Sequence, residues 1–186
     1  MNRRKMIQRV ASLHLRKVAE GKPASVLFSQ AVLENPRDLL NWFQDQTGLD
    51  PEGMGWKVAC HHMTIEFYDK KEKKALKREG KAESNILAPL ETLIGKSVVL
   101  DIVGYAHDDK GMVVLVEPKG PLARLVKNSD PHITIATAPG IGAKYSNELL
   151  EKGEIISART STQARVGWKD ARSGQDEFSL PHDFGE

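Results

Sequence analysis

Apolar and polar residues alternate with the same pattern in two short segments of the chain. His62-Met63-Thr64-Ile65 and His132-Ile133-Thr134-Ile135 each place a histidine and a threonine two residues apart, separated by apolar residues. Because successive side chains of a β-strand point to opposite faces, this alternation predicts two strands. We expect each strand to bury its apolar face and to present its histidine and threonine together on the other.

The histidine next to the first motif raises a question of register. A slip of one residue would bring His61, rather than His62, onto the polar face. Thr64 has the same parity as His62, and Pro131 stands where the second motif would need a competing histidine. We therefore assign the motif histidine to His62 and expect His61 on the opposite face or at the start of the strand.

Strands and helices are mixed along the rest of the chain, which predicts an α+β fold. An Asn35-Pro36 pair is typical of a helix start, and Gly48 of a helix end. The densely basic stretch 69–84 is expected to be an exposed helix or loop. The other expected strands span 25–33, 56–68, 96–105, 111–117, 132–136 and 155–168, and a short helix is expected near 146–152.

Length and composition fit one domain of ordinary globular type. The chain has 186 residues, of which 40% are hydrophobic and 28% charged. We expect a basic N-terminal helix or tail over 1–22, the domain over 23–170 and a polar C-terminal tail over 171–186. The sequence has neither a run of about 20 apolar residues nor a secretory signal, so we expect a soluble cytoplasmic protein that does not enter membranes.

The charge and the cysteine content restrict the possible partners and functions only slightly. A net charge of +2 and an isoelectric point near 8.6 mildly favour polyanionic partners. Cys60 is the single cysteine, so no disulfide within the chain is possible. Its position on a predicted strand favours a small buried residue over a thiol nucleophile.

Two imidazoles that converge across a cleft suit the cleavage of a phosphodiester. A neutral histidine takes a proton from the attacking hydroxyl or water, and a protonated one gives a proton to the leaving oxygen. Thr64 and Thr134 would donate hydrogen bonds to the phosphate oxygens. The sequence thus predicts His62 and His132 as catalytic residues of a phosphodiesterase, with no metal and no cofactor.

The paired motifs, HMTI at 62–65 and HITI at 132–135, resemble those of the two-histidine (2H) phosphoesterase superfamily over roughly residues 25–168. That superfamily includes RNA-ligase-like cyclic phosphodiesterases and a phage enzyme that degrades cyclic oligonucleotide defence signals. The resemblance implies a two-lobed fold in which two antiparallel sheets face each other across a groove, with helices outside. It also implies a metal-independent phosphoric diester hydrolase whose substrate is a nucleotide or RNA, commonly with a 2′,3′-cyclic phosphate.

Two alternatives remain open from the sequence. One is an enzyme of the phage type, which would open cyclic oligonucleotide signals with the same motifs. The other is a non-catalytic RNA-binding module, in which the basic segments 1–22 and 70–81 bind RNA and the histidines are structural. The loop before the predicted helix at 146–152 adds Lys144 and Tyr145 as candidate substrate contacts.

Overall fold

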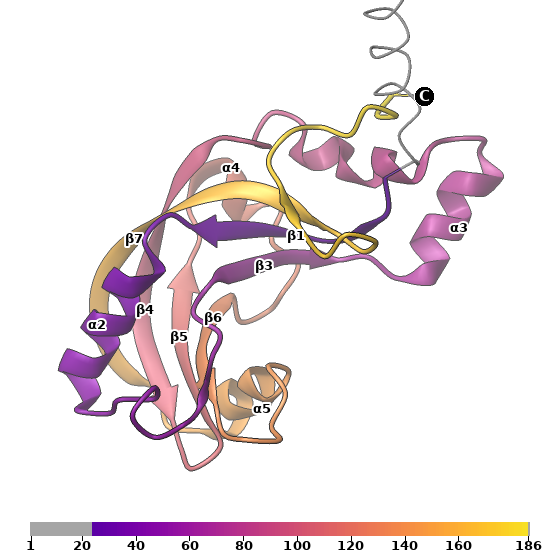
Figure 1. Cartoon of the computed structure of the whole chain (residues 1–186). Helices are drawn as coiled ribbons and strands as arrows, with labels where there is room; N and C mark the ends of the chain where they lie inside the picture. Colours follow the sequence, from indigo (N-terminus) through magenta and orange to yellow (C-terminus); the bar gives the residue numbers. More distant parts are fainter. Residues whose placement is uncertain (1–23, 186) are drawn as a thin grey trace, which may run out of the picture.

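The computed structural model describes residues 24–185, in which six antiparallel strands close into a barrel (Figure 1). A long strand, β7, pairs with β4 on one side and with β1 on the other, and this second pairing closes the ring. In order around the barrel the strands are β1 (Val26–Leu33), β3 (His62–Phe67), β6 (His132–Thr137), β5 (Gly111–Glu117), β4 (Ser97–His107) and β7 (Ile156–Asp170). Two short strands extend this sheet: β2 (Lys57–Val58) pairs with β6, and β8 (Asp176–Glu177) pairs with β7.

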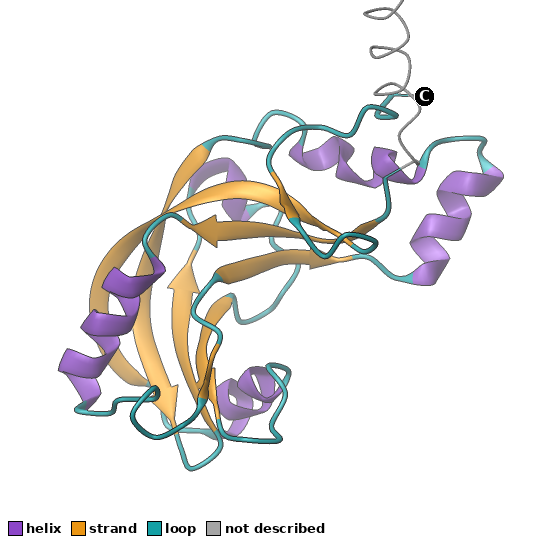
Figure 2. Cartoon of the chain, viewed as in Figure 1, coloured by secondary structure: helices purple, strands orange, loops and turns teal. Residues whose placement is uncertain are grey.

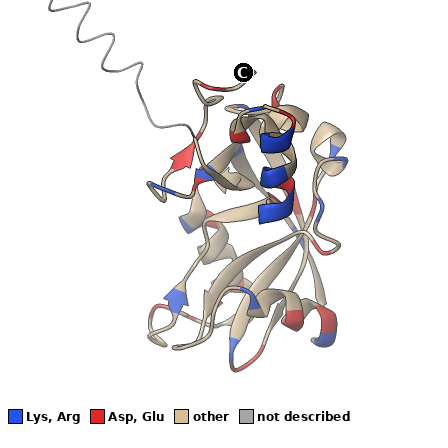
Figure 3. Ribbon diagram, turned by 90° about the vertical axis from the view of Figure 1, so that its right-hand side faces the viewer, with Lys and Arg blue, Asp and Glu red and all other residues tan. Residues whose placement is uncertain are grey.

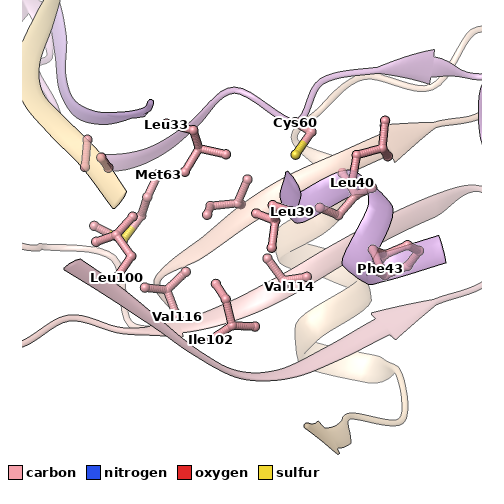
Figure 4. Close-up of a cluster of buried hydrophobic side chains, with 14 of the residues drawn as sticks. Leu33, Leu39, Leu40, Phe43, Cys60, Met63, Leu100, Ile102, Val114 and Val116 are labelled. Atoms are coloured by element: carbon pink, nitrogen blue, oxygen red, sulfur yellow. The ribbon is translucent and has the colours of Figure 1, made fainter. Parts of the chain in front are cut away.

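A row of apolar side chains in register fills the barrel where the two motif strands meet. Ala31 pairs with Met63, Met63 with Ile133, and Ile133 with Val114, and all four residues are fully buried. Neighbouring inward-facing side chains extend this row into one core (Figure 4). The apolar half of each alternating motif therefore faces the barrel interior, as the sequence predicts.

Helices lie around the barrel and cover parts of it (Figure 2). Helix α2 (Pro36–Thr47) begins after Asn35 and ends at Gly48, whose φ of 70° is the left-handed conformation that glycine adopts most easily. It buries Leu39, Leu40 and Phe43 in the core of the barrel. The remaining helices are α3 (Lys70–Arg78), the 3₁₀ helix η1 (Glu83–Leu90), α4 (Gly120–Ala123) and α5 (Tyr145–Lys152).

The α+β class is confirmed, but the strands form one continuous sheet where the resemblance implies two. The cause is β7, whose 15 residues are long enough to pair with strands from both halves of the molecule. The strand expected over 56–68 is divided into β2 and β3, because residues 59–61 leave the ladder between them. In that gap the amide of Ala59 bonds to the carbonyl of Ile135, and the carbonyl of His61 accepts from Leu33.

The described residues leave out the N-terminal segment and include nearly all of the C-terminal one. The segment 1–22, expected to be a basic helix or tail, lies outside the described residues. The segment expected to be a polar tail, 171–186, contains β8, and the indole of Trp168 donates a hydrogen bond to the carbonyl of Ser179. Within residues 24–185 no helix is both long enough and apolar enough to span a membrane.

Candidate active site

The two motif strands are neighbours, so their polar faces lie together on the outside of the barrel. Met63 and Ile133 are the single register pair between β3 and β6. In an antiparallel pair, one step forward on one strand meets one step back on the other. His62 is therefore level with Thr134, and Thr64 with His132, which gives the four side chains a pseudo-twofold arrangement.

A cavity of ≈ 640 Å³ opens over these four side chains. β3 and β6 share one register pair, and the loop before β6 and the start of α5 also contribute residues to the cavity. The cavity lies within the size range of ligand sites, about 300–1,000 Å³. Its lining comprises His62, Thr64, His132 and Thr134 together with Phe28, Ala59, Ile65, Glu66, Phe67, Lys127, Asn128, Ala143, Lys144 and Asn147.

The ring of His132 is oriented by the turn that precedes β6. Its Nδ1 lies 2.8 Å from the carbonyl oxygen of Asp130 and 3.4 Å from the side-chain nitrogen Nδ2 of Asn128. A proton on Nδ1 satisfies that carbonyl, and Nε2 is then the nitrogen that can exchange protons with a ligand. Burial lowers the pKa of His132, while the carbonyl and the charge of Asp130 oppose this shift by favouring the protonated ring.

His62 is held differently, by the stacking of its ring. Its imidazole stacks on the ring of Phe28, with centroids 5.3 Å apart and planes inclined by 21°. Its Nδ1 is buried and has no hydrogen-bond partner among residues 24–185. Burial is the main cause that lowers the pKa of His62 to about 4, and the positive charges of His61, Lys169 and His132 add to it. His62 is therefore neutral at pH 7.

A cluster of polar side chains borders His62 on the side of β8. Asp176 accepts hydrogen bonds from Gln30 (2.7 Å), His61 Nε2 (2.7 Å) and Lys169 (2.9 Å). Burial tends to raise the pKa of Asp176, but these three donors hold it below its usual value. The ring of His61 meets that of His62 edge-on at 5.6 Å. His61 thus lies immediately before β3 and contacts both Asp176 and the motif histidine.

The two threonines differ in their surroundings. Thr134 Oγ1 lies 2.8 Å from the hydroxyl of Ser146, a residue of the first turn of α5 that is 1% exposed. This contact ties the second motif to the helix. Thr64 makes no side-chain hydrogen bond within residues 24–185, so its hydroxyl is available to a ligand in the cavity.

Three other residues that the sequence singled out, Lys144, Tyr145 and Cys60, have different surroundings. Lys144 lines the cavity, whereas the hydroxyl of Tyr145 bonds to Asp108 Oδ2 at 2.5 Å. Burial raises the pKa of the Cys60 thiol to about 12, which favours the protonated, less reactive form. No group of three His, Cys, Asp or Glu side chains in the described part of the chain forms a metal-binding arrangement.

Sequence reasoning missed several residues of this site. Phe28, Lys127 and Asn128 line the cavity from segments with no motif of their own, and Asp176 belongs to the expected tail. Periodicity gives no signal for them, because their places depend on which strands become neighbours.

No family model matches this sequence, and no significant match was found among curated proteins.

Proposed function

We propose that this protein is a metal-independent phosphodiesterase that acts on nucleotides or RNA ends, with a 2′,3′-cyclic phosphate as the preferred group. The observation that carries the proposal is the meeting of both His-x-Thr motifs over one cavity, with their polar side chains on the same outer face. Resemblance of the two motifs to those of 2H phosphoesterases supports the same chemistry. In this proposal β1 and β3 belong to one lobe and β4, β5 and β6 to the other, with β7 joining them.

His62 and His132 divide the proton transfers of hydrolysis. Neutral His62 takes a proton from water, whose oxygen attacks phosphorus, and His132 gives its proton to the ribose oxygen whose bond to phosphorus breaks. The product is a phosphate monoester and a free ribose hydroxyl, and the two histidines exchange protonation states once per turnover. The assignment follows from the surroundings: the buried Nδ1 of His62 has no hydrogen-bond partner among residues 24–185 and burial favours the neutral ring, whereas the carbonyl and charge of Asp130 favour the protonated form of His132.

The threonines would act on the non-bridging oxygens of the same phosphate. Their hydroxyls lie on the same face as the histidines, and each is level with the histidine of the other strand. Hydrogen bonds directed at oxygens that gain charge in the transition state are typically worth 10²–10³ in kcat each. The hydroxyl of Ser146 fixes that of Thr134, which reduces the motion that must be frozen when the phosphate binds.

A panel of substrates tests the reaction class directly. We expect turnover of 2′,3′-cyclic mononucleotides or of oligoribonucleotides ending in this group, measured by chromatography of the products. Since the histidines themselves supply acid and base, activity should be unchanged when EDTA is present. Loss of activity to the chelator, or no turnover of any phosphodiester in the panel, would contradict the proposal.

The pH dependence tests the division of roles between the histidines. His62 must be neutral, so kcat/KM should rise as pH increases through about 4. His132 must be protonated, and its pKa lies below its ordinary value of 6.5, so kcat/KM should fall again at a pH under 6.5. We therefore expect a bell-shaped profile with its maximum on the acid side of neutrality. A maximum at alkaline pH would refute this assignment.

A further inference from the structure

A row of aromatic rings leads from the motif histidine to the rim of the cavity. The ring of Phe28 lies between those of His62 and Phe67, with centroids 5.3 Å and 6.0 Å away and planes inclined by 21° in both contacts. Phe67 is 63% exposed, although it lies on a barrel strand. Flat, exposed rings beside a phosphate site suit the stacking of a nucleobase, which needs no particular base.

The chain continues from this row directly into the basic helix α3. Tyr68 is buried and anchors the turn, and Asp69 caps the helix by accepting hydrogen bonds from the amides of Lys71 and Glu72. The nine residues of α3 include six basic side chains and one acid, and none of the nine is buried. Helix α3, with its Lys and Arg positions in blue, therefore lies on the face of the molecule that Figure 3 shows.

Most of the basic side chains of α3 form no ion pair within residues 24–185. Lys73 pairs with Glu83 at 2.9 Å. Lys70, Lys71, Lys74, Lys77 and Arg78 make no ion pair with any residue between 24 and 185. A helix that buries nothing in the core and holds unpaired cations beside an exposed aromatic ring is the arrangement expected of a surface that follows a nucleic-acid backbone.

We propose that the substrate is the 3′ end of a single-stranded RNA, not a free cyclic nucleotide. Resting on the phosphodiesterase activity proposed above, the terminal cyclic phosphate occupies the cavity at His62 and His132, with Lys127 and Lys144 beside it. The base of the terminal nucleotide stacks on the exposed ring of Phe67. The preceding phosphates lie along α3. A cyclic mononucleotide has no phosphate that reaches the helix, so the helix distinguishes the two classes of substrate.

The test compares two substrates in one set of variants. The substrates are a short oligoribonucleotide that ends in a 2′,3′-cyclic phosphate and the matching cyclic mononucleotide. In the triple variant Lys70→Gln, Lys74→Gln, Lys77→Gln, we expect KM for the oligonucleotide to rise about tenfold or more, with kcat unchanged. Both constants for the mononucleotide should stay the same. The decline of log(kcat/KM) with log[salt] should become shallower by ~0.7 for each phosphate that the variant no longer neutralises.

Further variants test the stacking on Phe67 and control for the loss of positive charge elsewhere on the surface. Phe67→Ala should lower kcat/KM about 10- to 100-fold on both substrates, and Phe67→Trp should retain it. The matched control Lys96→Gln, Lys119→Gln, Lys152→Gln removes the same charge from exposed lysines that do not line the cavity, and should leave both substrates unaffected.

The outcomes are distinguishable. Equal effects of the α3 variant on both substrates, or no effect on either, would overturn the RNA path while leaving the phosphodiesterase activity intact. Faster turnover of a cyclic di- or trinucleotide than of the oligoribonucleotide would do the same and would favour a signal-degrading enzyme. Absence of turnover on every substrate would sink the activity itself, and salt-sensitive binding without turnover would favour an RNA-binding module.

Discussion

Replacing His62 or His132 with alanine is expected to lower kcat on a 2′,3′-cyclic phosphate by ~10²–10⁴-fold in each case. In the proposed mechanism each histidine performs one of the two proton transfers. The two effects should not add in the double variant, because a histidine without its partner already fails to complete the reaction.

The control for this result is His107→Ala. His107 ends β4, where its ring stacks on that of Tyr105 at 6.3 Å, and it does not line the cavity. We expect full activity from this variant. Thermal unfolding of all the variants shows whether a fall in activity reflects chemistry or folding. A fully active His62→Ala or His132→Ala enzyme would rule out the paired-histidine mechanism.

The local structure of the site could be predicted from the sequence because it depends on period and parity alone. Alternation in the two motifs determines which side chains face the core, and Met63 and Ile133 are indeed fully buried. Asn35-Pro36 and Gly48 mark both ends of α2, since proline and glycine restrict or relax the backbone at specific positions. Such signals act within a few residues and are readable from one sequence.

The arrangement of these elements could not be predicted in the same way. Whether β7 joins two sheets into a barrel depends on its length and on pairings with strands far away in the chain. Asp176 reaches His61 across 115 residues of sequence only because β8 pairs with β7. Contacts of this kind are decided by which strands become neighbours, and the hydrophobic pattern of any one segment contains no information about that choice.

Met63→Ala is expected to lower the free energy of unfolding by about 2–5 kcal/mol, the usual cost of truncating a fully buried large side chain. Met63 is in register with Ala31 on one side and Ile133 on the other, so the truncation leaves a void between three strands. Chemical denaturation measures the change, and a lower midpoint with an unchanged slope would show that the barrel is weakened but still unfolds as a unit.

The same substitution should also affect the site, for a geometric reason. The pairing of Met63 with Ile133 is the single register pair that holds the two motif strands together, and the four polar side chains on the outer face take their spacing from it. Met63→Leu keeps the volume and should cost less than about 1.5 kcal/mol while retaining activity. Thr64→Val changes only the outer face and should leave the unfolding midpoint nearly unchanged. If Met63→Ala lowered stability but kept full kcat, the spacing of the motifs would have to be set by other contacts, such as the hydrogen bond between Thr134 and Ser146.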